Sequence, residues 1–441
     1  MDNSQYVKWF RNSSPYINAH RGKTFVLMLE GEAIADDNFA HIVQDIALLN
    51  SLGVRLVIVH GARPQIDQAL SVLDIKSQFH GDLRITDKPA LNAVRAAIGI
   101  VKSDIEARLS FGLPNTPMHG ARIRVVSGNF VTAKPKGVID GVDFQHTGEV
   151  RRIDRQAINQ QLDQGNVVLL SSCGYSPSGQ MFNLAAEDVA TRAAISLAAE
   201  KLILMGEGGG LAANNGEVES DSGIISQITA DELSHLIDSL EGEYKMHAEA
   251  SLVAVHAGIN RVHMLSHKND GALLQELFTH KGAGTLISAD DYEQLRQANI
   301  EDVGGILKLL TPLEEQGILV RRSREILETE IHRFKVIERD GMIIACAALY
   351  PYSSDLAELA CVAVSGDYRS GERGDRLLKA ISKQAKAENK TKLFVLTTRT
   401  AHWFMERGFE EADLSALPQE RQSLYNFQRN SKIFIKDLTE C

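Results

Sequence analysis

Short apolar runs alternate with amphipathic stretches along the first two thirds of the chain. Runs of β-branched and other apolar residues predict strands over 24–29, 55–60, 122–127, 167–170, 201–205 and 261–265. Between these runs, apolar residues recur at helical spacing and predict helices over 38–52, 63–72, 88–111, 154–164, 185–199 and 272–279. Such alternation is typical of a mostly parallel sheet with helices on both faces. We therefore expect an α/β fold for this part of the chain.

Two stretches inside this part break the alternation, namely "HGDLRITD" (80–87) and "AKPKGVIDGVDFQHTGEVRRID" (133–154). Glycine and aspartate between short apolar pairs indicate short strands joined by turns. Ligands of parallel sheets bind at the carboxyl ends of the strands. We expect the two stretches to form a lid over those ends.

A different order begins after the stretch "LISADDYEQLRQANIED" (286–302). The pattern there predicts helices over 301–316, 321–332, 371–389 and 400–407, and strands over 333–338, 342–350, 357–365, 392–397, 424–428 and 431–436. This order is typical of a compact α+β domain. We therefore predict an α/β domain over 21–288, a linker over 289–294 and an α+β domain over 295–441.

Residues 1–20 precede the first predicted strand and form a segment of their own. The spacing of Tyr6, Trp9 and Phe10 predicts an amphipathic helix that is broken at Pro15. An aromatic helix outside the sheet is either an arm that binds another subunit or a part of the core, and we favour the arm.

Composition excludes several classes of protein. Of 441 residues, 44% are hydrophobic and 24% are charged, which is ordinary for a globular chain. The net charge of −10 argues against nucleic acid or an acidic membrane as partner. No apolar stretch reaches the roughly 20 residues that span a bilayer, and the first residues do not resemble a signal peptide. We expect a cytoplasmic protein.

The four cysteines are Cys173, Cys346, Cys361 and Cys441, and no two of them form a CxxC pair. This spacing indicates neither a zinc site nor a disulfide framework. We predict no metal.

A loop with arginine and glycine residues joins a strand to a long helix in the second domain. The strand ends at Val364, "RSGERG" (369–374) follows, and the helix starts there. Exposed N–H groups at a helix start, together with arginines, can bind a pyrophosphate. Downstream lies "HWFMERGF" (402–409). This order resembles the GNAT acetyltransferase family, although Glu372 replaces the central glycine of the usual (R/Q)xxGx(G/A) loop.

The resemblance implies acetyl-CoA as co-substrate and an amine as acceptor. Residues expected to contact the cofactor are Cys361, Val362, Val364, Arg369, Ser370, Gly371, Arg373, Gly374 and Phe404. A strand that diverges from its neighbour, here 358–364, would direct N–H groups at the thioester carbonyl. Glu358 is the candidate base, acting directly or through water, and Thr397 or Thr398 is the candidate acid for the leaving thiolate.

Cations suggest the nature of the acceptor. "GILVRRS" (317–323) carries Arg321 and Arg322, and "NFQRNSKIF" (426–434) carries Arg429. Arginine pairs carboxylates through two hydrogen bonds, so two arginines from separate elements suit an acceptor with two carboxylates.

Over its whole length the sequence resembles the bacterial N-acetylglutamate synthase family, amino-acid N-acetyltransferases in which an amino-acid kinase-like domain precedes a GNAT domain. The stretches that carry the resemblance include "LVIVHGARPQID", "GILVRRSRE", "LFVLTTR", "HWFMERGF" and "LYNFQRNSK". It implies that L-glutamate is the acceptor and that N-acetyl-L-glutamate is made in the first step of arginine biosynthesis. The matching substrate residues are Leu319, Arg321, Cys361, Arg429 and Ser431.

The kinase-like domain departs from the kinase pattern at three places. Amino-acid kinases carry lysine and paired glycines where "LMLEG" has Met28, Glu30 and Gly31. A glycine-rich "HGGGP" is replaced by "HGARP", with Ala62 and Arg63, and "FNLAAED" keeps only Asn183. Lys201 survives. Loss of the phosphate-binding charge and of the open backbone predicts a domain without kinase activity.

In arginine-sensitive relatives, this domain binds L-arginine, the feedback effector, near the N-terminal helix. The positions that resemble the site are Tyr16, Lys201, Gln275, Glu276, Leu277, Phe278, Gly282, Gly284 and Thr285. Glu276 suits a guanidinium, and the glycines would expose backbone groups to the α-carboxylate and amine. The family further implies a homo-oligomer, a hexamer, assembled through the N-terminal helix.

Two other functions stay open from the residues alone. One is a GNAT acetyltransferase for another amino acid or amine, and the other is a non-catalytic arginine sensor. The arginine pair favours a dicarboxylate acceptor over a peptide, and Glu358 with the two threonines favours catalysis over sensing.

Overall fold

The computed structural model describes residues 3–110, 115–116, 119–212, 223–279, 282–289, 293–339, 341–368, 373–423 and 431–439. The chain forms two compact units, Met1–Asp290 and Asp291–Cys441.

One large sheet organises the first unit. Its strand order is β14 (Gln227–Thr229), β16 (Thr285–Ser288), β15 (Arg261–Ser266), β13 (Lys201–Gly206), β1 (Thr24–Leu29), β2 (Arg55–His60), β10 (Val167–Ser171) and β5 (Val125–Ser127). All neighbours are parallel except β15 and β16. The predicted parallel-sheet fold is confirmed.

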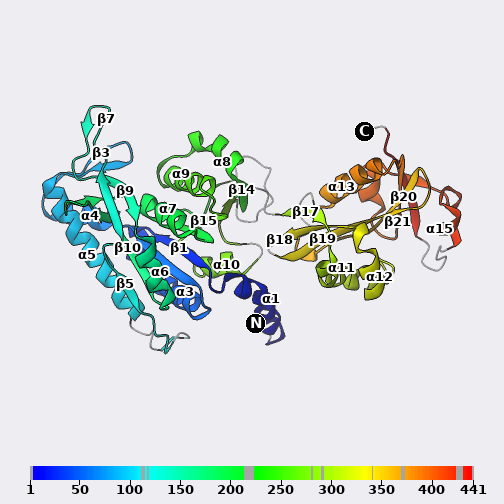
Figure 1. The fold of residues 1–441 in the computed structure, drawn as a ribbon, viewed down its shortest axis with the longest axis horizontal. Helices are drawn as coiled ribbons and strands as arrows, with labels where there is room; N and C mark the ends of the chain where they lie inside the picture. The colour runs from blue at the N-terminus through cyan, green and yellow to red at the C-terminus, as the bar shows by residue number, and fades with distance from the viewer. Residues whose placement is uncertain are drawn as a thin grey trace. The chain divides into compact units, whose positions relative to one another are not determined.

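Both faces of this sheet are covered by helices (Figure 1). Alternate residues of β1 serve the two cores, since Val26 and Met28 face one side and Phe25, Leu27 and Leu29 the other. The first face packs against α6 (Arg155–Asp163), α7 (Ala186–Leu197), α8 (Ala230–Leu236) and α9 (Gly242–His256). The second packs against α3 (Phe39–Ser51), α4 (Arg63–Val72), α5 (Lys88–Ser110) and α10 (Ala272–Phe278).

The turn-rich stretches form short strands near the carboxyl ends of β1 and β2. They comprise the hairpins β3 (Gln78–His80)–β4 (Leu83–Ile85) and β7 (Val138–Ile139)–β8 (Val142–Asp143). A second sheet joins β12 (Met181–Asn183), β11 (Cys173–Tyr175), β6 (Val131–Pro135) and β9 (Gly148–Ile153). Phe79, Leu83 and Thr147 line one cavity together with Gly31 and Gly61, which follow β1 and β2. Part of the turn-rich stretches therefore lies beside the carboxyl ends of β1 and β2, where the lid was expected.

Some predicted elements differ from the structure. The strand expected over 122–127 is reduced to β5, because only Val125–Ser127 pair with β10. Helix α1 (Asn3–His20) continues through Pro15, so the predicted break is wrong. α9 was not predicted, because its buried positions are alanine, serine and histidine, with Val255 the one larger apolar residue among them.

The second unit is built on a mainly antiparallel sheet. Its order is β17 (Gln294–Gln297), β18 (Phe334–Arg339), β19 (Met342–Pro351), β20 (Leu356–Val364), β21 (Lys392–Thr397), β23 (Lys432–Asp437) and β22 (Glu410–Ala412). Only β20 and β21 run parallel among these neighbours. α11 (Val303–Glu315) and α12 (Arg324–Glu330) cover one face, and α13 (Arg373–Ala387) and α14 (Ala401–Met405) cover the other (Figure 1).

Most predicted elements of this unit are present. The helix expected from 321 begins at Arg324, after the N-cap Ser323, whose side chain accepts from the Ile326 N–H. Gln294, placed in the predicted linker, begins β17 and pairs with Glu338. The strand predicted over 424–428 lies outside the described residues.

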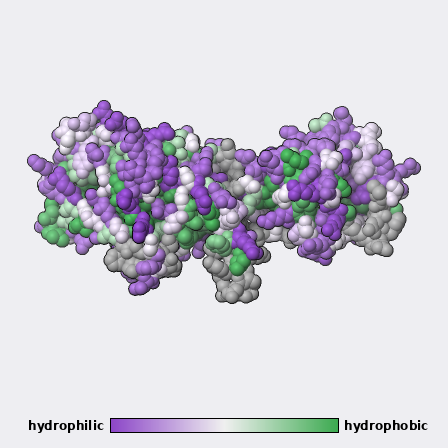
Figure 2. Space-filling model, turned by 60° about the horizontal axis from the view of Figure 1, so that its bottom comes forward, coloured by the Kyte–Doolittle hydropathy of each residue, from purple (hydrophilic) through white to green (hydrophobic). Residues whose placement is uncertain are grey.

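Hydrophilic residues dominate the face of the molecule that Figure 2 shows, with apolar residues in small groups. Within the described part of the chain, no helix is long and apolar enough to cross a membrane.

Candidate functional site

Two parallel strands separate in the middle of the second unit. β20 and β21 pair only over Leu356–Lys392, Ala357–Leu393 and Glu358–Phe394. Beyond Glu358, β20 continues to Val364 without pairing to β21, which itself continues to Thr397. The divergence leaves backbone N–H and C=O groups of β20 facing the gap, as the sequence predicted.

A bulge at Cys361 marks the divergence. On β19, Cys346 pairs with Ala363 and Ala348 with Ala360, so β20 carries one extra residue. Cys361 has φ 53°, which is rare for a residue other than glycine. Burial is the main reason that the pKa of the Cys361 thiol is raised to about 12. The thiol is therefore neutral near pH 7 and is a poor nucleophile.

The gap between the strands is a cavity of about 540 Å³. It brings together predicted site residues from separate elements, namely Leu319, Glu358, Cys361, Val362, Val364, Gly374, Thr397 and Phe404. Further lining comes from Arg322, Arg399, Trp403, Arg407 and Arg421, among others. The cavity thus combines one buried carboxylate with several guanidinium groups, a composition that suits an anionic ligand.

Glu358 is held by an arginine that the sequence did not point to. The Arg421 Nε donates to Glu358 Oε2 at 2.9 Å and its Nη2 donates to Oε1 at 3.1 Å. The Glu358 side chain is 8% exposed and that of Arg421 is 17% exposed. Burial and the nearby Glu358 carboxylate raise the pKa of Tyr352 to about 12, so its hydroxyl stays protonated. No motif in "QERQS" distinguishes Arg421 from a surface arginine.

Thr397 ends β21 on the opposite side of the gap. Its Oγ1 lies 2.8 Å from Thr400 Oγ1 and accepts the Thr400 N–H at 3.1 Å. Because either hydroxyl can be the donor, the pair can pass a proton along.

Cations from the predicted substrate segments are placed differently from the prediction. Arg321 is exposed and is not among the residues that line the cavity, whereas Arg322 lines it. Both residues lie in an irregular segment before α12, in which Arg322 is half-buried and Arg321 is exposed. The Arg322 guanidinium also lies 5.6 Å from the centre of the Tyr350 ring. Ser431 is buried outside this lining, and Arg429 lies outside the described residues.

The start of α13 is shaped by close packing. A Cβ on Gly374 would lie 2.8 Å from Trp403 Cζ2, so glycine lets the indole cover the helix start. The Arg373 side chain donates to the buried Glu293 with distances of 2.6 to 2.9 Å, and does not line the cavity. It therefore anchors the helix, and its backbone remains the part that suits a pyrophosphate. Arg369, Ser370 and Gly371 lie outside the described residues.

In the first unit, three of the residues predicted for an effector, Lys201, Glu276 and Gly284, belong to a buried polar cluster, whereas Gln275 is exposed. His263 Nδ1 lies 2.6 Å from Glu276 Oε1, and its Nε2 lies 3.4 Å from the Lys201 Nζ. The N–H groups of Ala283 and Gly284 donate to Glu276 Oε2 at 2.7 and 3.2 Å. Burial and the Lys201 ammonium lower the pKa of His263. The sequence missed His263, which the parallel pairing of Lys201 with Arg261 brings close.

Helix α1 packs beside this cluster. His20 Nε2 lies 2.8 Å from the Leu277 carbonyl oxygen, and the His20 ring packs edge-on against Phe25 and Phe278. Tyr16 lies one turn before His20, at a ring distance of 6.4 Å. The remaining residues predicted for the effector lie on nearby segments. Gln275 lies on α10 and Gly282 has φ +68°. Thr285 Oγ1 donates to the Ile225 carbonyl oxygen at 2.6 Å. Segments far apart in sequence thus meet where the effector was expected.

The position of Lys201 argues against reading it as a retained kinase residue. It begins β13, beside Phe25 near the start of β1, whereas Glu30 follows the other end of β1. Five strand residues separate the two ends, roughly 16 Å. Lys201 is thus no remnant of the phosphate end of a kinase.

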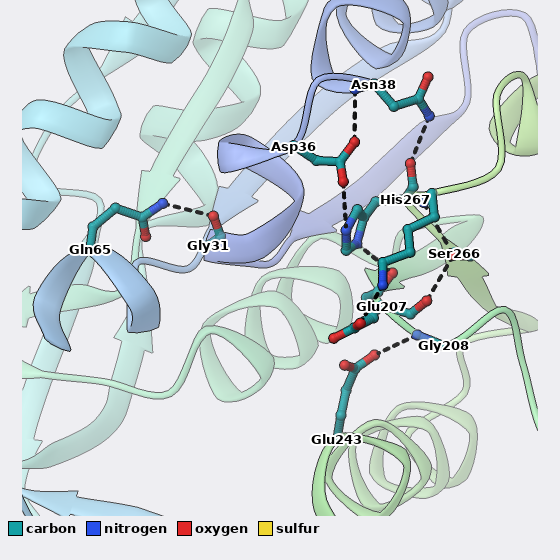
Figure 3. A network of polar contacts seen from close by, with 11 residues as sticks. Gly31, Asp36, Asn38, Gln65, Glu207, Gly208, Glu243, Ser266 and His267 are labelled. Atoms are coloured by element: carbon teal, nitrogen blue, oxygen red, sulfur yellow. Dashed lines mark hydrogen bonds and ion pairs between the residues drawn. The ribbon is translucent and has the colours of Figure 1, made fainter. Parts of the chain in front are cut away.

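At the carboxyl ends of β1, β13 and β15, carboxylates and histidines form a polar network. Glu30 Oε1 lies 3.0 Å from His247 Nε2, and Glu243 accepts the Gly208 N–H at 3.4 Å. Figure 3 shows Glu243 beside Gly208, and Asp36 and Asn38 joined to His267. Burial and the Glu30 carboxylate raise the pKa of Glu243. Negative groups at this edge oppose a polyphosphate.

The other altered kinase positions agree with this. Met28 is fully buried in the sheet core, so no cation reaches the edge from that position. Ala62, Arg63 and Asn183 line a small cavity of about 80 Å³ with Glu30 and Glu187. Such a volume is too small for a nucleotide.

Comparisons with known proteins agree with the two units. Residues 23–266 match the model of the amino acid kinase family, and residues 330–411 match the model of the acetyltransferase (GNAT) domain. The amino-acid acetyltransferase of Ectopseudomonas mendocina (strain ymp) is 56% identical over 434 residues, 98% of this chain and 99% of that protein.

Solved structures of similar chains cover both units. The N-acetylglutamate synthase from Neisseria gonorrhoeae complexed with coenzyme A and L-arginine is 36% identical, with a TM-score of 0.88 over 98% of this chain and 99% of that chain. The same enzyme complexed with coenzyme A and N-acetyl-glutamate is 37% identical, with a TM-score of 0.62 and the same coverage.

Proposed function

This chain belongs to the family of amino-acid acetyltransferases in which an amino acid kinase domain precedes a GNAT domain, and from this premise we propose that it transfers the acetyl group of acetyl-CoA to the α-amine of L-glutamate. The family and fold class expected from the sequence are thereby confirmed. Glutamate and coenzyme A are proposed because a similar enzyme was solved with coenzyme A and N-acetyl-glutamate.

The observation that carries the proposal is the divergence of β20 and β21 at Glu358. One strand offers N–H groups to a thioester carbonyl, and Glu358 and Thr397 line the same cavity. Glu358 takes one proton from the substrate ammonium, directly or through water, and the freed amine attacks the carbonyl carbon. The C–N bond forms, the C–S bond breaks, and the leaving thiolate takes a second nitrogen proton through Thr397. The neutral Cys361 thiol supports direct transfer to the amine.

Contacts for both substrates are proposed from the lining and from the family resemblance. Val362, Val364, Gly374 and Phe404 would contact the cofactor together with Cys361 and the start of α13. Leu319 and an arginine of the 317–323 segment would contact glutamate, with Arg429 and Ser431 completing the site. The lining favours Arg322 over Arg321 for that arginine.

The buried cluster of Lys201, His263 and Glu276 is proposed to bind L-arginine, with Tyr16 of α1 beside it. Its support is the meeting of α1, β13 and α10 at one place, and a similar enzyme solved with L-arginine. An effector that binds there and biases two arrangements of the chain would regulate the acetyltransferase. The enzyme would then catalyse the first step of arginine biosynthesis, as a cytoplasmic homo-oligomer assembled through α1.

One assay tests both parts. Purified full-length protein is given acetyl-CoA and a panel of amino acids, coenzyme A release is followed, and L-arginine is then added. We expect L-glutamate to give the highest kcat/KM, N-acetylglutamate to form, and the rate to change on adding L-arginine but not D-arginine. Another preferred acceptor contradicts the substrate, and cofactor binding without turnover of any acceptor indicates a sensor.

A further inference from the structure

Glu358, the base proposed for acetyl transfer, is already hydrogen-bonded to another side chain in the structure. Both oxygens of Glu358 accept hydrogen bonds from Arg421, at 2.9 and 3.1 Å, in a two-point pair. Both side chains are largely buried, so water does not replace these bonds freely. A proton that arrives at Glu358 must compete with an N–H of Arg421 for the same oxygen.

Geometry also says what can loosen this pair. Arg421 lines the same cavity as Glu358 and Arg322. The positive charge of Arg322 disfavours the protonated form of Arg421, so the two guanidinium groups repel each other. Two guanidinium groups facing one carboxylate leave the cavity with an excess of positive charge. An anion that enters gains from both guanidinium groups and draws Arg421 away from Glu358.

An acidic amino acid complements this arrangement. It carries two carboxylates and one ammonium group, and the cavity offers Arg322, Arg421 and Glu358. With the carboxylates on the arginines, the ammonium takes the place of Arg421 beside Glu358. An amino acid without a second carboxylate supplies one partner fewer and leaves Arg421 on Glu358.

We propose that Arg421 is a specificity-determining residue that holds Glu358 until a carboxylate of the acceptor takes over its guanidinium, which frees Glu358 to receive the amine proton. The inference rests on the proposed acetyl transfer. It adds that the second carboxylate of the acceptor raises the rate of the chemical step as well as the affinity. Proton balance is unchanged, because Arg421 keeps its proton and only exchanges one carboxylate partner for another.

The test compares acceptors on the full-length enzyme. L-Glutamate and L-glutamine have the same length, and only glutamate has the second carboxylate. We expect Arg421→Gln to raise kcat for glutamine and lower kcat for glutamate, so that the ratio of the two falls at least about 10-fold. Arg421→Lys keeps the charge and should restore part of the ratio. Arg324→Gln, on an exposed arginine of α12 paired with Glu328, is the matched control and should leave both values unchanged.

A pH profile separates this role from a structural one. The profile of kcat/KM reports the free enzyme, in which Arg421 is on Glu358, and that of kcat reports the complex. In the wild type we expect the acid limb of kcat at higher pH than that of kcat/KM. In Arg421→Gln the two limbs should coincide at the higher pH.

Two outcomes overturn the proposal. One is a parallel loss of kcat for both acceptors with an unmoved acid limb in folded Arg421→Gln or Arg421→Lys, and the other is an unchanged ratio in both variants. If the wild type prefers another acceptor, the proposed substrate fails by itself. The same comparison is then made between that acceptor and its counterpart without the second charged group.

Discussion

At the scale of single residues, the cavity proposed for acetyl transfer depends on backbone positions more than on unusual side chains. Cys361 has a positive φ because β20 bulges there, and the bulge turns the strand away from β21. Glu358 is the last residue paired across the two strands and therefore stands at the point where they part. Thr397 lies at the end of the strand opposite. The roles proposed for Glu358 as base and for Thr397 as acid depend on these two positions on either side of the gap.

Arg322 and Arg321 provide a residue-scale prediction. Arg322→Ala should raise the KM for glutamate by about 30- to 100-fold, or ~2–3 kcal/mol, if it forms a charge-assisted pair with a substrate carboxylate. Arg321→Ala, on the neighbouring exposed residue, should change the KM by less than about threefold, as expected of a solvent-exposed charge. Initial rates at varied glutamate measure both. A larger effect at Arg321 would contradict the placement of Arg322 in the site.

At the scale of elements, the contact between α13 and α14 shapes the end of the cavity where we propose that the cofactor binds. Trp403 and Phe404 of α14 pack edge to face at 4.9 Å, and Phe404 packs on Phe409 at 5.3 Å. The Arg407 guanidinium lies 4.1 Å from the centre of the Trp403 ring. This aromatic layer presses Trp403 against Gly374 at the first turn of α13. The motif "HWFMERGF" is thus a packing element that shapes the start of the helix.

Gly374 tests this packing. Gly374→Ala should displace Trp403, because its Cβ would lie 2.8 Å from the indole Cζ2. We expect a KM for acetyl-CoA raised about 10-fold and stability lowered by ~1–3 kcal/mol, the usual cost of overpacking. Trp403→Leu in the same chain should recover stability. Acetyl-CoA titrations and thermal unfolding measure both effects.

Gly304→Ala is the matched control for this substitution. Gly304 lies in α11, where an added Cβ meets nothing within 4 Å. Alanine there should stabilise the helix by ~0.5–1 kcal/mol and leave the KM for acetyl-CoA unchanged. Equal behaviour of the two variants would show that contact with Trp403 has no effect.

At the scale of the whole molecule, the first unit has the sheet of the amino acid kinase family, but the side chains at both ends of its strands differ from those of a kinase. The carboxyl end of the sheet carries the carboxylates of Glu30 and Glu243, both paired with His247, where a polyphosphate would need free positive charge. Burial lowers the pKa of His247, but hydrogen bonding and the charge of Glu30 outweigh it and raise the pKa above its ordinary value. The other end carries the Lys201, His263 and Glu276 cluster beneath α1. These features support the proposal that the first unit binds an effector and does not transfer phosphoryl groups.

We expect no ATP-dependent phosphorylation of N-acetylglutamate by the full-length protein. Glu30→Gly should not restore it, because Met28 lies in the core and supplies no charge to the transferring phosphoryl group. ADP release, followed with and without N-acetylglutamate, measures this, with an active N-acetylglutamate kinase as the positive control. Turnover by either protein that depends on N-acetylglutamate would overturn the assignment.

The sequence by itself determined the order of elements in both units and the loss of kinase residues. Apolar periodicity is a local property, so strands such as 24–29 and 55–60 were predicted to the residue. The sequence also predicted Glu358, Cys361 and Thr397 as site residues, because they lie in segments that resemble a known family, and the structure places all three in the lining of one cavity. The prediction failed for α9, whose buried face consists mostly of small or polar residues, and at Pro15, where the surrounding helix tolerates one missing hydrogen bond.

Only the tertiary structure decided which charges meet. Arg421 lies 63 positions from Glu358, and no local pattern marks it as the partner of that carboxylate. The choice between Arg321 and Arg322 depends on which of them lines the cavity. The role of Lys201 depends on the end of the sheet at which its strand begins. His263 reaches Lys201 because their strands lie side by side. Pairing between distant segments arises from packing of the whole sheet, so it cannot be inferred from the spacing of residues along the chain.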